Sequence, residues 1–221
     1  MPVTVGFLPP AGKAWTGLQT PRGPFLGALI LLWLAARISA LGAPYAVYAV
    51  LDVALLPVVA GVFLSVQLRA KNRRNLPLAG ILMTLALVNL AFHLNVLEVI
   101  EWPALHALYA ALALIVMIEC VIGGRVIPFF TTNATPGLKI AAWPRFEYVV
   151  LAVTGLALLS WVAQAQGAWS VAVLALAAML HFWRQLRWAP WKTLTRPILW
   201  ILHAAYIWIP IGLALLALAQ A

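Results

Sequence analysis

Seven apolar stretches follow one another along the chain, with only short polar connections between them. An α-helix rises about 1.5 Å per residue, so roughly 20 apolar residues cross the hydrocarbon core of a bilayer. The stretches lie at 25–41, 44–68, 76–97, 104–122, 147–165, 168–187 and 197–219. This pattern predicts an all-α fold, a polytopic transmembrane helix bundle with about seven helices.

Composition agrees with a membrane protein that has very little soluble chain. Of the 221 residues, 65% are hydrophobic and only 9% are charged, a balance unlike that of a water-soluble domain. Residues 1–24 contain five prolines and no apolar core. We therefore expect a non-helical cytoplasmic N-terminal segment at 1–24, followed by a single transmembrane helical domain at 25–221.

Lysine and arginine fall in alternate connections. The connections at 42–43, 98–103 and 164–168 hold none, whereas the other side holds Lys13, Arg22, Arg69, Lys71, Arg73, Arg74, Arg125, Lys139, Arg145, Arg184, Arg187, Lys192 and Arg196. Cytoplasmic loops carry such an excess, so the N-terminus is expected in the cytoplasm and the C-terminus outside. The net charge of +9 then reflects topology and contact with anionic lipid headgroups, and nucleic acid is not an expected partner.

One basic residue lies inside a predicted span. Arg37 falls toward the outer end of the first stretch, and Asp52 sits at the matching depth on the second. An ionised side chain in hydrocarbon costs about 2.5–3.5 kcal/mol, so a structural ion pair between Arg37 and Asp52 is expected. The alternative is that Arg37 extends its head to the outer headgroups.

The four histidines are the candidate metal or haem ligands, because imidazole is a common ligand of both. By depth, His93 and His106 fall near the outer surface, and His181 and His203 fall toward the cytoplasm. The alternative for each is a hydrogen bond across a helix interface. The single cysteine, Cys120, excludes an internal disulfide and a thiolate-rich cluster.

Proline marks three places in or beside the spans. Pro57 and Pro210 fall inside predicted helices, where each removes a backbone hydrogen bond and should bend the helix. Pro128 lies in the segment 122–133, IGGRVIPFFTTN, which follows the fourth span. With two glycines and this proline, the segment is expected to be an apolar loop, and its Arg125 offers a fork of donors for carboxylates.

That segment resembles the GGRVIPFFT stretch of the NnrS family of bacterial membrane proteins. Other segments are similar to the family in the same order, so the resemblance covers nearly the whole chain. They are Trp15-Thr16-Gly17, Leu32-Trp33-Leu34 with Arg37, Asn72-Arg73-Arg74-Asn75-Leu76, Asn89 with Phe92-His93-Leu94, and Leu199-Trp200-Ile201-Leu202-His203 with Trp208-Ile209-Pro210.

The resemblance implies a haem- and copper-containing protein of the bacterial inner membrane. It also implies a role in nitric oxide metabolism, denitrification and resistance to nitrosative stress. His93 and His203 lie within family-like motifs and are the ligand candidates, while Arg125 could pair with haem propionates. Family members usually have about twelve helices, so the chain is expected to correspond to the central portion of that architecture.

The residues leave two functions open. One is a redox metalloprotein that binds haem or copper and lowers nitric oxide toxicity. The other is a cofactor-free membrane carrier or assembly partner, in which buried polar side chains only hold helices together. No nucleophile or acid–base pair stands out in the sequence, so turnover, binding and sensing of nitric oxide are all compatible with it.

The charge pattern makes a direct prediction about topology. A reporter fused after Arg74 should read as cytoplasmic, and one inserted at Gln166 should read as outside, because the connections that carry these two residues are expected on opposite sides. A phosphatase and fluorescent-protein fusion pair at each position measures this. The reverse reading at either position would contradict the assigned orientation.

Overall fold

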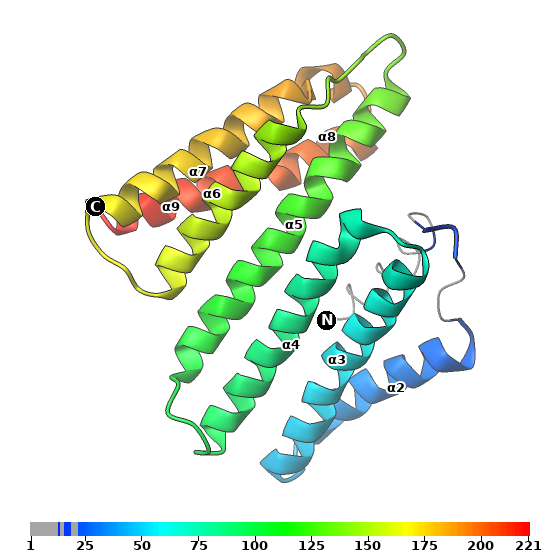
Figure 1. Cartoon of the computed structure of the whole chain (residues 1–221), viewed down its shortest axis with the longest axis vertical. Coiled ribbons are helices and arrows are strands. Elements are labelled where there is room, and N and C mark those ends of the chain that lie inside the picture. The colour runs from blue at the N-terminus through cyan, green and yellow to red at the C-terminus, as the bar shows by residue number, and fades with distance from the viewer. Residues whose placement is uncertain (1–12, 14–15, 19–21) are drawn as a thin grey trace. The chain divides into compact units, whose positions relative to one another are not determined.

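The computed structural model describes residues 13, 16–18 and 22–221, apart from the side chain of Arg74. The expected non-helical segment at 1–24 falls mostly outside the described residues. Most of the described residues are in helices (Figure 1). They are α2 (Pro24–Ser39), α3 (Tyr45–Arg69), η1 (Arg73–Asn75), α4 (Leu76–Val96), α5 (Ala104–Ala134), α6 (Pro144–Val162), α7 (Ala168–Arg187), η2 (Pro190–Thr193), α8 (Pro197–Tyr206) and α9 (Trp208–Ala219).

Within this described part, six helical segments are long and apolar enough to cross a membrane. These are α3, α4, α5, α6, α7 and the combined segment of α8 and α9, Pro197–Ala219. The seventh apolar helix, α2, is shorter, with 16 residues. The prediction of an all-α, multi-pass membrane protein is thereby confirmed.

Local sequence explains where the helices begin and end. Proline occupies the first turn of α2, α4, α6 and α8, where its missing N–H leaves no helical bond unmade. Four helices end two residues before a left-handed residue: Lys71 after α3, Glu98 after α4, Gln164 after α6 and Ala189 after α7. Such a residue turns the chain and lets later N–H groups reach the last carbonyls.

The segment 122–133 is helical, so the expectation of a loop there is wrong. The helix α5 runs without interruption from Ala104 to Ala134 and contains Pro128. Proline removes only the hydrogen bond to the carbonyl four residues earlier, that of Gly124. Every other backbone group of this apolar segment gains a partner by staying helical, which is the stronger requirement in a bilayer.

The other two prolines differ in their surroundings. The helix α3 passes through Pro57 as a single element. Near Pro210 the last span divides into α8 and α9 at Ile207, and the helical bonds resume with the N–H of Ile211 on the Ile207 carbonyl at 3.2 Å. Pro210 has no N–H group, so the carbonyl of Tyr206 receives no helical hydrogen bond from it.

Packing divides the chain into two compact units, 1–114 and 115–221, with the boundary inside α5. In the first unit α3 packs between α2 and α4, and Leu56, Leu85 and Ala86 form a core that Ala111 and Leu114 of α5 cover. In the second unit α7 packs between α6 and α9. A core of Ile127, Trp188 and Tyr206 lies there. The prediction of a single transmembrane domain stays a prediction.

Candidate functional site

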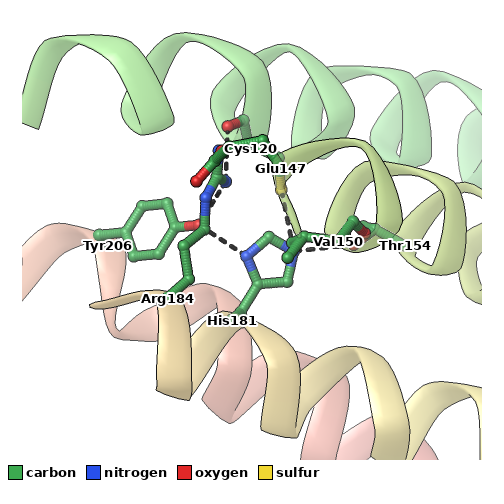
Figure 2. A network of polar contacts seen from close by, with 7 residues as sticks. All are labelled: Cys120, Glu147, Val150, Thr154, His181, Arg184 and Tyr206. Carbon is green, nitrogen blue, oxygen red and sulfur yellow. Dashed lines mark hydrogen bonds and ion pairs between the residues drawn. The ribbon is translucent and has the colours of Figure 1, made fainter. Parts of the chain in front are cut away.

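A buried arginine is the centre of a polar network in the second unit (Figure 2). Arg184 lies near the end of α7, and only 2% of its side chain is exposed. Its Nη2 forms an ion pair with Glu147 in the first turn of α6. Its Nη1 donates to the backbone carbonyl of Cys120 and to the hydroxyl of Tyr206, both at 2.9 Å. The Glu147 carboxylate supplies the counter-charge that an arginine needs inside a helix bundle.

His181 joins this network with both ring nitrogens. The Tyr206 hydroxyl lies 2.6 Å from Nδ1, and Thr154 Oγ1 lies 2.8 Å from Nε2. Thr154 Oγ1 donates to the Val150 carbonyl at 2.7 Å, so it accepts from Nε2. The imidazole hydrogen is thereby placed on Nε2, and Nδ1 accepts from the Tyr206 hydroxyl. Cys120 Sγ is also 3.6 Å from Nε2. The buried imidazole is therefore held in one tautomer by a chain of hydrogen bonds.

Two glycines of α5 make room for the network. A Cβ on Gly124 would overlap the guanidinium of Arg184, and one on Gly123 would lie 3.1 Å from the ring of Tyr206. The absence of side chains at these positions lets the arginine reach the α5 backbone. The Gly-Gly pair thus serves close packing against α7 and α8 within a regular helix.

His203 on α8 has a different environment. Its Nε2 lies 3.0 Å from Thr131 Oγ1, and Gln185 Nε2 donates to its backbone carbonyl at 2.7 Å. Its Nδ1 is buried without a hydrogen-bond partner among the described residues, and so is Gln185 Oε1. If Nε2 carries the hydrogen and donates it to Thr131, the lone pair on Nδ1 is free to bind a further group.

The first unit holds a second polar cluster, built around Asp52. This carboxylate forms an ion pair with Arg37 and accepts from Asn89 Nδ2 at 3.2 Å. His93 Nε2 lies 3.3 Å from the same carboxylate, and His93 Nδ1 lies 2.8 Å from the Tyr45 hydroxyl. The structure thus brings Arg37 and Asp52 together and occupies both ring nitrogens of His93.

The remaining candidates are His106 and Arg125. His106 is half-buried near the start of α5, and its Nδ1 has no hydrogen-bond partner in the described part of the chain. Arg125 is half-buried on α5 and already interacts with other groups. No three His, Cys, Asp or Glu side chains among the described residues lie together in a way that could hold a metal ion.

Arg184, Glu147 and Tyr206 were not among the residues expected to form a site. The charge pattern assigned Arg184 to the basic cytoplasmic side, although it lies three residues inside α7. The sequence did contain an indication that Arg184 faces the interior, because it follows His181 by three residues and therefore lies on the same face of the helix. Glu147 also lies at the corresponding end of the preceding helix.

Comparison with family models places the whole chain in one family. The model described as "NnrS protein" matches residues 1–221, essentially the whole chain. Neither the curated proteins nor the solved structures contain a match.

The close contact between Gly124 and the Arg184 guanidinium leads to a prediction about stability. Gly124→Ala would place a methyl group where the Arg184 guanidinium lies, and overpacking of this kind lowers the free energy of unfolding by about 1–3 kcal/mol. Gly155→Ala on α6 is the matched control, since a Cβ there meets no atom within 4 Å and alanine favours the helix. Thermal unfolding in detergent should show a lower Tm for the first variant only. Equal changes in Tm for the two variants would mean that Gly124 is not tightly packed against Arg184.

The Arg184–Glu147 pair makes a second prediction. Glu147→Gln leaves a buried guanidinium without a counter-charge, and we expect a loss of about 1–3 kcal/mol, less than for a fully buried pair because 32% of the Glu147 side chain is exposed. Adding Arg184→Gln should recover part of that loss. Unfolding of the two single variants and the double variant in detergent measures the coupling. Strictly additive losses would exclude it.

Proposed function

Because the chain belongs to the NnrS family, we propose that it is a bacterial inner-membrane protein that binds haem or copper and contributes to nitric oxide metabolism and to resistance against nitrosative stress. The match over residues 1–221 carries this proposal, and it supports a nitric-oxide-associated membrane protein in general terms. The six membrane-length helices within the described residues agree with a multi-pass location in the bilayer. The N-terminus in the cytoplasm and the C-terminus in the periplasm are part of the proposal.

His203 is the residue that best fits a haem or copper ligand. Its Nδ1 is buried and has no hydrogen-bond partner in the described part of the chain, while Thr131 can hold the ring through Nε2. Histidine ligands commonly donate their second N–H to an oxygen in this way. A haem iron or a copper ion would supply one-electron redox chemistry and a binding position for a small molecule.

The other candidates fit less directly. His93 and His181 would each have to give up a hydrogen bond before either ring nitrogen could bind a metal. His106 Nδ1 has no hydrogen-bond partner among the described residues, and His106 is the second candidate ligand. Arg125 lies on the same unit as His203 and is kept as the candidate partner of haem propionates.

One observation favours a different function, that of a cofactor-free carrier or assembly partner. Both ring nitrogens of His93 and of His181 have hydrogen-bond partners, including a tyrosine hydroxyl in each case, and only 2% and 0% of the two residues are exposed. Such networks hold helices together without any metal. This function would leave nitric oxide chemistry to partner proteins.

A spectroscopic experiment separates the two functions. The protein is expressed with haem precursor and copper supplied, purified, and measured for visible absorption, pyridine haemochrome and metal content. The proposal expects a near-stoichiometric Soret band or copper content that is lost in His203→Ala and kept in His181→Gln. A parent protein with neither cofactor would support the cofactor-free function. If His203→Ala retains the cofactor, another residue must be the ligand, and His106→Ala is the next variant to test.

A further inference from the structure

Three side chains of the first unit form a directed hydrogen-bond relay. The Tyr45 hydroxyl lies 2.8 Å from His93 Nδ1, and His93 Nε2 lies 3.3 Å from Asp52 Oδ2. An ionised carboxylate can only accept, so the imidazole hydrogen belongs on Nε2. The lone pair of Nδ1 then faces the phenolic hydrogen of Tyr45. The order hydroxyl, imidazole, carboxylate is the arrangement that activates hydroxyl nucleophiles in enzymes.

The carboxylate of this relay is held in place from its other side. Arg37 forms an ion pair with Oδ1 of Asp52, and Asn89 donates to Oδ2 at 3.2 Å. These contacts orient the Asp52 carboxylate toward the imidazole. His93 itself is 2% exposed, so water does not compete for its nitrogens. The base is thus fixed relative to the phenol.

Tyr45 is less buried than its base, His93. Tyr45 is the first residue of α3 and is half-buried, directly after the exposed connection 41–44. A small molecule that approaches the end of the helix can therefore reach the Tyr45 ring, whereas His93 is enclosed by Tyr45, Tyr48 and Phe92.

We propose that Tyr45, His93 and Asp52 form an activated-phenol site that reacts with small acyl or sulfonyl electrophiles. The Tyr45 oxygen attacks the electrophilic centre, the bond from that centre to its leaving group breaks, and the leaving group departs with its electron pair. The phenolic proton passes to His93 Nδ1. Asp52 is a positioning residue, because it stabilises the imidazolium that forms without touching the electrophile. This site does not depend on haem or copper.

Two other tyrosines provide internal controls. Tyr48 is half-buried on the same helix, and its ring lies 5.2 Å from that of His93, nearly the 5.6 Å of Tyr45. The hydroxyl of Tyr45 is the one that bonds to the imidazole nitrogen. Tyr148 in the second unit is 74% exposed. If exposure alone governed reactivity, Tyr148 would react first.

The test is competitive labelling of the intact protein in detergent with an aryl sulfonyl fluoride, followed by mass-spectrometric mapping of each tyrosine. General-base assistance is worth about 10²-fold or more, so Tyr45 should label at least about tenfold faster than Tyr48 and Tyr148. His93→Gln should reduce the Tyr45 rate to that of Tyr48. Asp52→Asn should reduce it several-fold, and Tyr48→Phe should leave it unchanged.

Two results would overturn the proposal. The first is a parent protein in which Tyr45 labels no faster than Tyr48. The second is a His93→Gln variant that elutes as a folded, monodisperse protein and keeps the parent rate at Tyr45. If His93→Gln does not fold, the Tyr45 to Tyr48 ratio in Asp52→Asn decides, and an unchanged ratio there also overturns the relay.

Discussion

The cost of a charge in hydrocarbon shapes both polar clusters of this protein. A bilayer offers neither water nor counter-ions, so an arginine inside a span is stabilised by a carboxylate or by carbonyl groups of neighbouring helices. Arg184 has Glu147, and Arg37 has Asp52. In each unit the ion pair then orders further polar groups, among them a tyrosine and a histidine. The helices of each unit are thereby held together by polar contacts that lipid cannot replace.

The same constraint governs the backbone. Pro128 and Gly124 both weaken a helix in water, yet α5 passes through both. In lipid, leaving the helix would expose many unsatisfied peptide groups, which costs more than the single hydrogen bond that Pro128 removes. The glycine that weakens the helix also gives the Arg184 guanidinium its place against the α5 backbone. The segment 122–133, whose sequence alone suggests a loop, is thus a helix that contacts its neighbours in the packed unit.

Much of the fold follows from the sequence, and less of the candidate site does. The boundaries of α3, α4 and α7 lie within one residue of the apolar stretches at 44–68, 76–97 and 168–187, since membrane helices follow hydrophobic length. The prediction placed the end of α5 at residue 122, because it gave Pro128 more weight than the need of the backbone for internal hydrogen bonds. The pairing of Arg37 with Asp52 could be inferred from depth alone, as these residues lie on consecutive helices.

The partners of the histidines could not be inferred in that way. Tyr206 lies 25 residues from His181, and Thr131 lies 72 from His203. Such contacts depend on how helices rotate about their axes, which depth along the membrane normal does not specify. Arg184 was hidden for another reason: an arginine close to a helix end looks the same in sequence whether it faces headgroups or a neighbouring helix.

The order of the charged residues in the Arg184 pair has a consequence for biogenesis. Glu147 is synthesised 37 residues before Arg184, and in the folded protein it lies in the first turn of α6. The two helices can enter the bilayer as a hairpin whose opposite charges meet at once. Tyr206 arrives later on α8 and closes a site that is already electrically neutral. In this pair the counter-charge thus precedes the arginine in the order of synthesis.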